Sequence, residues 1–269
     1  MNTLILTDFS DTATHAGKYA IDLFQDATVN FYLLNIQNLN STEALVPSPI
    51  LGLNQNPKDQ IQKQYGELKQ YAKQPGHSFY TILSNENLVN ATRKYMLEKK
   101  IDLIVMGTSS ADFSNTSILG NRTREIIQKI KCSVLMVSER SKFKMPKKFV
   151  LPVDTTINTE NSIPDFLRSK IFNAQTNITI VEIGMPLDRI RKSLSIKKKF
   201  GFSESSSQCN FLEFKQTINL SDGLLKEIQE NYNMVIILGK NLSICKKLVE
   251  SYDGKWSAKN NNLPVLVLH

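Results

Sequence analysis

Short apolar runs alternate with amphipathic stretches along the first half of the chain. The runs are rich in Ile, Leu and Val, and the stretches between them space their apolar residues as on one face of a helix. This alternation predicts strands that are separated by helices. The predicted strands of this half are residues 3–7, 29–36, 77–84, 102–106 and 133–137.

Four helices are predicted between these strands, and several of them carry sequence signals at their ends. The segment 8–12, DFSDT, offers capping side chains before the first helix, and Asn87 offers one before the third. Pro75 and Gly76 end the second helix. The predicted apolar helix faces are Ala13, Ala16, Ala20 and Leu23; Ile61, Tyr65, Leu68 and Ala72; Leu88, Ala91 and Tyr95; and Ile126, Ile127 and Ile130. Strongly apolar strands between helices are typical of a mostly parallel sheet covered on both faces, which is an open α/β fold.

The second half repeats the order and the spacing of the first. Gly107 and Val134 are 27 positions apart, and their counterparts Gly239 and Val265 are 26 positions apart. Such agreement indicates an internal duplication. The predicted strands of this half are residues 148–154, 177–183, 210–214, 233–239 and 263–268.

The length of 269 residues is ample for two cores, so we expect two domains, 1–139 and 147–269, joined through the polar and basic segment 138–148. The composition, 41% hydrophobic and 22% charged, is ordinary for a soluble globular protein. No apolar run approaches the roughly 20 residues of a membrane span, and the N-terminus lacks the pattern of a signal peptide. We expect a cytoplasmic protein.

The net charge of +8 comes mainly from the second half. Residues 1–140 carry 14 Lys and Arg against 13 Asp and Glu, whereas residues 141–269 carry 19 against 12. The densest basic run, RIRKSLSIKKKF at 189–200, could attract phosphates. We interpret it as a solvated surface and do not expect nucleic-acid binding, because no base-stacking aromatics are interleaved with its lysines.

Cysteine and histidine spacing predicts neither a disulfide framework nor a metal site. Cys132, Cys209 and Cys245 form no CxxC pair and are odd in number. The three histidines are far apart in sequence and form no HExxH or HxH grouping. We therefore expect no bound metal and buried or half-buried thiols.

Several motifs in order resemble those of a known family. The strand followed by TDFS at the start, DLIVMG followed by a glycine-spaced loop, and the closing CSVLMV resemble a universal stress protein domain. The second half resembles it more faintly, so the whole chain looks like a tandem member. The resemblance implies two Rossmann-like domains of the adenine nucleotide alpha hydrolase-like kind, each with a five-stranded, mostly parallel sheet and helices on both faces.

The resemblance also implies an adenine-nucleotide site in the first half. In nucleotide-binding members an aspartate after the first strand contacts adenine or ribose, and the loop after the fourth strand reads GxxGxxxxxxxxxG followed by Ser or Thr. Glycines let a backbone approach an anion, and amides at a helix start donate to phosphate oxygens. The residues implied to bind ATP, with Mg²⁺, are Thr7, Asp8, Ile36, Met106, Gly107, Ser110, Gly120, Asn121 and Arg122.

Two residues depart from that loop pattern. Ser110 stands where the family has its second glycine, which would be strained only at a positive φ. Asn121 replaces the final hydroxyl residue and still offers an amide donor. The alternative is a loop that binds nothing, with Asp8 serving only to cap a helix.

The second half keeps Asp154 but not the loop. Cys245, Leu248, Val249 and Tyr252 already fit a helix face after Gly239, so we expect no ATP there and a structural or regulatory role. The final strands, SVLMV and PVLVL, are suited to covering each other's edges within the chain. Pairing of the same strands between two chains, as a homodimer, is the alternative.

These features lead us to expect a stress-response binding module that responds to ATP or a related adenine nucleotide. The alternative is an interaction protein of the same fold that binds no nucleotide. An enzyme is disfavoured, because the first strand is followed by TDFSDT rather than an HxGH, SGGxDS or GxGxxG motif, and the sequence offers no nucleophile–base pair.

Overall fold

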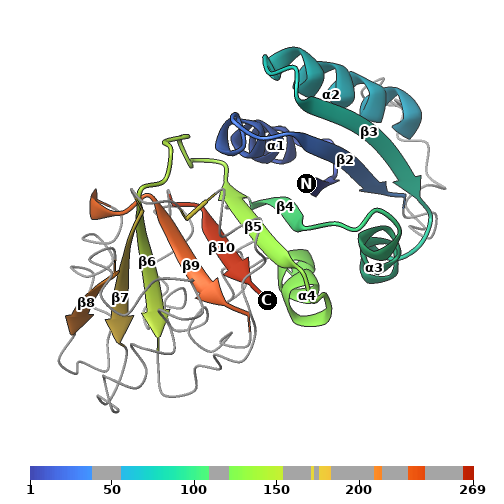
Figure 1. Cartoon of the computed structure of the whole chain (residues 1–269). Helices are drawn as coiled ribbons and strands as arrows, with labels where there is room; N and C mark the ends of the chain where they lie inside the picture. Colours follow the sequence, from blue (N-terminus) through green and yellow to red (C-terminus); the bar gives the residue numbers. More distant parts are fainter. Residues whose placement is uncertain are drawn as a thin grey trace, which may run out of the picture.

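Ten strands form one open sheet in the computed structural model of the chain (Figure 1). The structure describes residues 1–37, 56–108, 121–153, 171–172, 176–182, 209–213, 230–239 and 263–269. The strands of the first half are β1 (Asn2–Thr7), β2 (Val29–Ile36), β3 (His77–Ser84), β4 (Leu103–Thr108) and β5 (Ser133–Ser138). Those of the second half are β6 (Lys148–Val153), β7 (Asn177–Glu182), β8 (Cys209–Glu213), β9 (Met234–Leu238) and β10 (Val265–Leu268). Every strand predicted from an apolar run is confirmed.

The strand order is the same in the two halves. The sheet runs β3-β2-β1-β4-β5-β10-β9-β6-β7-β8, and neighbouring strands within each half are parallel. The halves meet at β5 and β10, which pair antiparallel with Val134 opposite Val267 and Leu135 opposite Leu266. The open, mostly parallel α/β fold is thereby confirmed. The division into domains 1–139 and 147–269 stays a prediction.

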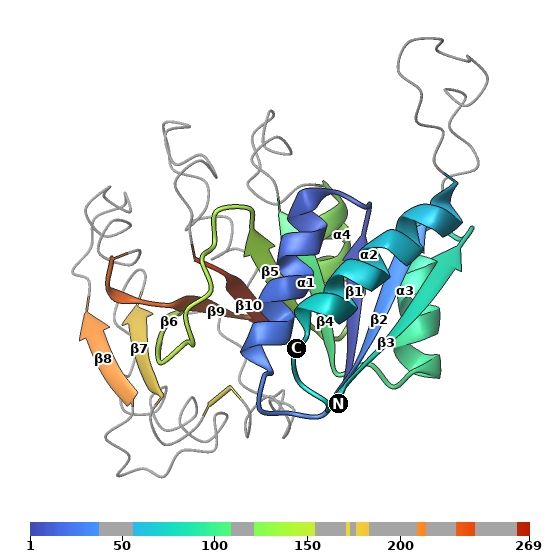
Figure 2. The ribbon, with the colours of Figure 1, turned by 90° about the horizontal axis from the view of Figure 1, so that it is seen from above.

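Helices cover both faces of the first half (Figure 2). On one face lie α1 (Asp11–Leu23) and α2 (Pro57–Tyr71), and on the other lie α3 (Leu88–Glu98) and α4 (Asn121–Lys129). Of the helices expected in the second half, the described residues include only the helical positions 230–231.

Two apolar groups, one on each face, hold these layers together. Neighbouring residues of a strand face opposite sides, so Ile5 packs toward α1 and α2 while Leu4 packs toward α3 and α4. Burying one such side chain contributes about 1.5–3 kcal/mol. Phe149 and Leu266 belong to the Ile5 group, so that group continues across β5 and β10 into the second half. Within the described ranges, no helix combines the length and apolar character that crossing a membrane requires.

Polar side chains start the first three helices. Ser10 caps α1, and its Oγ accepts a hydrogen bond from the Ala13 amide at 3.2 Å. Asn56 caps α2 just before Pro57, and Asn87 caps α3 as its sequence position predicts. The segment DFSDT therefore does contain a cap, and the capping residue is Ser10 rather than Asp8.

Candidate functional site

The carboxyl ends of β1, β2 and β4 lie together at one edge of the sheet. Thr7 at the end of β1 is opposite Asn35 of β2, and Leu6 is opposite Met106 of β4. The helix that follows β1 covers one face, whereas the helix that follows β4 covers the other. In open α/β sheets ligands bind where the strand order switches in this way, so the β1–β4 edge is the candidate site.

Asp8 stands at this edge immediately after β1. Its side chain is exposed, and its Oδ1 accepts a hydrogen bond from the Ser10 amide at 3.0 Å. Toward the residues that the structure describes, its other carboxylate oxygen has no hydrogen-bond partner. Asp8 therefore shapes the β1–α1 turn with one oxygen, and its second oxygen is left without a partner among the described residues.

The turn that carries Asp8 has a strained backbone. Phe9 has a φ of 68°, in the left-handed region that costs a non-glycine residue roughly 1–2 kcal/mol. Its amide donates to Thr7 Oγ1 at 2.9 Å, and its ring packs against the apolar group under α1. These two contacts hold the conformation in place.

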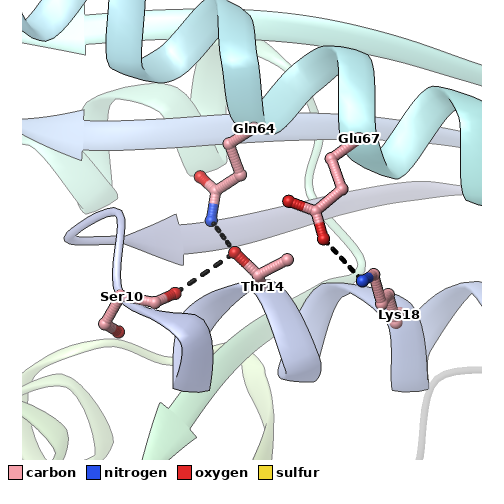
Figure 3. Close-up of polar contacts among 5 residues, drawn as sticks. All are labelled: Ser10, Thr14, Lys18, Gln64 and Glu67. Carbon is pink, nitrogen blue, oxygen red and sulfur yellow. Dashed lines mark hydrogen bonds and ion pairs between the residues drawn. The ribbon is translucent and has the colours of Figure 1, made fainter.

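The hydroxyl of Thr7 belongs to a buried polar network that reaches α2. Thr7 Oγ1 donates to Gln64 Oε1 at 2.7 Å, and Gln64 Nε2 donates to Thr14 Oγ1 at 2.8 Å. Thr14 Oγ1 in turn donates to the Ser10 carbonyl oxygen at 3.2 Å, as Figure 3 shows. The side chain of Thr7, which the sequence assigns to nucleotide binding, is thus engaged inside the protein.

Gln64 is a residue that the sequence reasoning missed. It is 4% exposed although it lies on a mostly polar helix. It falls three positions after Ile61 and four before Leu68, so helical spacing alone places it on the buried face of α2. The signal in the sequence is a polar residue on the otherwise apolar face of this helix, which indicates a buried hydrogen bond.

Ile36 and Met106 lie on the opposite face from Thr7. Met106 is 6% exposed and belongs to the apolar group beneath α3 and α4, against which Ile36 is partly buried. Both side chains therefore belong to the apolar layer of that face, at the ends of β2 and β4. Their packing against adenine stays a prediction.

Gly107 packs against the start of α1. A Cβ atom on Gly107 would lie 2.6 Å from the Thr12 carbonyl oxygen and 2.8 Å from its carbonyl carbon. Both are backbone atoms that cannot move aside. The need for glycine at this position is therefore explained by contact between β4 and α1, before any ligand is considered.

The rest of the predicted phosphate loop is only partly described. Ser110 and Gly120 lie outside the described residues, and Asn121 is the first residue of α4. Arg122 follows in the first turn of α4 with its side chain exposed. Arg122 thus places an exposed cation at the start of α4.

The matching edge of the second half is built differently. A Cβ atom on Gly239 would lie 2.5 Å from ring atoms of His269, whereas one on Gly107 would meet backbone atoms of Thr12. Pairing of β6 with β9 extends only to Val150, before Pro152, which has no amide hydrogen to donate. Asp154 and the basic run 189–200 lie outside the described residues.

Two groups with strongly raised pKa values, Tyr71 and Cys132, lie away from this edge, at the end of α2 and just before β5. A hydrogen bond to Asp22 raises the pKa of Tyr71 to about 12, with burial as a second cause. Burial raises the pKa of the Cys132 thiol to about 12. Among the described residues, no three His, Cys, Asp or Glu side chains are grouped so that they could hold a metal ion.

Strand order and helix placement define an open α/β protein whose candidate ligand-binding edge lies between β1 and β4. The sequence model of the universal stress protein family matches residues 1–138. The chain therefore belongs to the universal stress protein family.

One relative and one solved structure are similar to this chain. A universal stress protein of Methanocaldococcus jannaschii is 27% identical over 154 residues, which cover 54% of this chain and 82% of the relative. The crystal structure of a universal stress protein from Archaeoglobus fulgidus aligns with a TM-score of 0.62 at 14% identity, covering 99% of this chain and 97% of that one. The second likeness concerns the fold and extends over both halves.

Proposed function

We propose that the first half binds an adenine nucleotide, ATP or a close relative, at the β1–β4 edge and acts as a regulatory binding module. The observation that carries the proposal is the exposed carboxylate of Asp8 at a strand-order switch, with one oxygen unpartnered among the described residues. A carboxylate there accepts hydrogen bonds from the hydroxyls of a ribose, as acidic residues do in related α/β folds.

Each predicted residue then has a distinct part. Asp8 accepts hydrogen bonds from the nucleoside. Ile36 and Met106 pack against the adenine ring. The backbone at Gly107, Ser110 and Gly120, the start of α4 at Asn121 and the cation of Arg122 receive the phosphates, which Mg²⁺ accompanies. Thr7 supports the site indirectly, because its hydroxyl is hydrogen-bonded to Gln64 and to the Phe9 amide of the turn.

We assign a binding role and no enzymatic one. The groups assigned to this edge are a carboxylate, two apolar side chains, backbone amides and a guanidinium, which recognise and hold a ligand. None of these assignments pairs a nucleophile with a base. A nucleotide that joins β1, β4 and α4 ties together segments from distant parts of the chain.

The second half is proposed to be a second domain with a structural or regulatory role. The shortened β6–β9 pairing and the His269 ring against Gly239 distinguish its edge from the first. We infer that the halves form two domains, 1–139 and 147–269, joined by the β5–β10 pairing within one chain. The protein is expected to act in the cytoplasm.

Calorimetric titration of the full chain with ATP and Mg²⁺ tests the proposal. We expect saturable heat, and about tenfold or more weaker binding for Asp8→Ala, since hydrogen bonds to a charged group contribute roughly 1.5–3 kcal/mol. Gly120→Val should abolish binding with the fold intact. If the titration gives no heat and millimolar nucleotide causes no thermal shift, the proposal is wrong. An interaction protein that binds no nucleotide is then favoured.

A further inference from the structure

Gln64 connects both sides of the turn that carries Asp8. Its amide is buried on α2 and is satisfied at both ends by hydroxyl groups, those of Thr7 and Thr14. Each hydroxyl contacts the turn backbone, Thr7 through the Phe9 amide and Thr14 through the Ser10 carbonyl. One side chain from another helix therefore holds the residues before and after Asp8.

The amide of Gln64 also sets the direction of each hydrogen bond. A hydroxyl has one proton to donate and lone pairs that accept. Thr7 Oγ1 donates a hydrogen bond to Gln64 Oε1, so its oxygen is free to accept one from the Phe9 amide. Thr14 Oγ1 accepts a hydrogen bond from Gln64 Nε2 and donates one to the Ser10 carbonyl oxygen. Without Gln64 each threonine hydroxyl keeps only its hydrogen bond to the turn and loses the one that fixes it from α2.

The turn needs this support, because its conformation is not one that the chain adopts freely. Phe9 has a positive φ, and such backbone persists only when its surroundings fix it. The bond from Phe9 to Thr7 is one of those fixing contacts. Loosening it allows the turn to relax and changes where the exposed carboxylate of Asp8 lies.

We propose that Gln64 is a positioning residue for the nucleoside contact of Asp8. It lies inside the α1–α2 interface and touches no ligand. Its amide acts through Thr7 and Thr14 to keep the β1–α1 turn in its binding shape. This inference rests on the proposed function, because Asp8 is taken as the nucleoside-binding group.

A matched pair of substitutions at the same helix interface tests the role of Gln64. Gln64→Leu keeps much of the volume and removes both hydrogen bonds. Glu67→Gln, one turn further along α2, removes only the exposed ion pair with Lys18, also drawn in Figure 3. In the full chain we expect Gln64→Leu to weaken ATP binding about tenfold and Glu67→Gln to leave it within about twofold. Gln64→Met serves as a second variant if the leucine variant is unfolded by circular dichroism.

A double-mutant cycle with Asp8→Asn separates positioning from a general loss of structure. Positioning predicts that Gln64→Leu weakens ATP binding much less in the Asp8→Asn background than in the unsubstituted chain. An equal weakening in both backgrounds overturns the inference while the proposed function stands. Absence of ATP binding by the unsubstituted chain overturns both.

Hydrogen exchange supplies a readout that needs no ligand. The amides of Phe9 and Ser10 should exchange at least tenfold faster in Gln64→Leu than in Glu67→Gln, because the turn has lost its support. Unchanged exchange at these two amides in a folded Gln64→Leu protein contradicts the inference, whatever the nucleotide affinity.

Discussion

Gly107, near the end of β4, packs directly against the carbonyl group of Thr12 at the start of α1. We predict that Gly107→Ala lowers the free energy of unfolding by about 1–3 kcal/mol without any nucleotide, because the added methyl group meets backbone atoms. Urea unfolding followed by circular dichroism measures this change. The substitution is therefore a test of packing and a poor test of phosphate binding.

Gly66 provides the matched control for that substitution. It is exposed on α2, and a Cβ atom there would have nothing within 4 Å. Gly66→Ala should raise the free energy of unfolding by about 0.5–1 kcal/mol, since alanine is the better helix former. Equal stability of the Gly107→Ala and unsubstituted chains would contradict the close contact.

Pairing of β5 with β10 predicts that the two halves lose stability together. Leu266 has no exposed surface and lies opposite Leu135, so Leu266→Ala should cost about 2–5 kcal/mol. Leu97→Ala is the control, because Leu97 is 67% exposed and should change stability by less than about 0.5 kcal/mol.

Native-state hydrogen exchange locates the effect of Leu266→Ala. Amides of both β5 and β9 should exchange faster, because β10 pairs with each of them. Faster exchange confined to β9 would show that β5 does not depend on this pairing in solution.

The hydrogen bond from the Tyr71 hydroxyl to Asp22 predicts a stability difference that depends on pH. The oxygens are 2.7 Å apart, and Tyr71→Phe keeps the ring while removing the hydroxyl. The raised pKa favours the neutral phenol in the folded chain, so its contribution is complete below pH 10 and is lost as pH rises toward 12. Tyr71→Phe should therefore cost about 0.5–1.5 kcal/mol at pH 8 and less at pH 10.5.

Urea unfolding at the two pH values measures how the difference in free energy of unfolding between the Tyr71→Phe variant and the unsubstituted chain decreases. Tyr80→Phe is the control, since the hydroxyl of Tyr80 has no hydrogen-bond partner within the described part of the chain. A Tyr71→Phe deficit of the same size at both pH values would contradict the assigned bond.

Cys132 is predicted to resist alkylation in the folded protein. It is buried, its thiol donates to the Ile101 carbonyl oxygen, and its pKa is about 12, so almost no thiolate is present at pH 8. Iodoacetamide treatment followed by peptide mass spectrometry should find Cys132 unmodified until urea unfolds the chain. Modification at the rate of a free cysteine under native conditions would show that this end of β5 opens.

The strands and the first-half helices follow from the sequence because their signals are local. Every strand lies on an apolar run, and Asn87 starts its helix where the cap pattern predicts. The site depends on contacts between distant segments, which no local pattern records. Gly107 fits the loop motif, yet its contact is with Thr12, and the Thr7 hydroxyl is taken by Gln64.

The choice between Asp8 and Ser10 as helix cap shows the same limit. Both residue types cap helices, and both lie just before α1. The positive φ of Phe9 sets the turn so that Ser10 reaches the Ala13 amide and Asp8 reaches only the Ser10 amide. Residue type and position in the sequence alone cannot decide which of two capping residues in one short turn caps the helix.

Photolabelling with 8-azido-ATP tests most directly whether an adenine nucleotide binds at the β1–β4 edge. The azide lies on the adenine ring, so we expect label in peptides that contain Ile36 or Met106, and unlabelled ATP should compete it away. Label recovered only from residues 147–269, or label that unlabelled ATP does not reduce, would show that adenine does not bind at this edge.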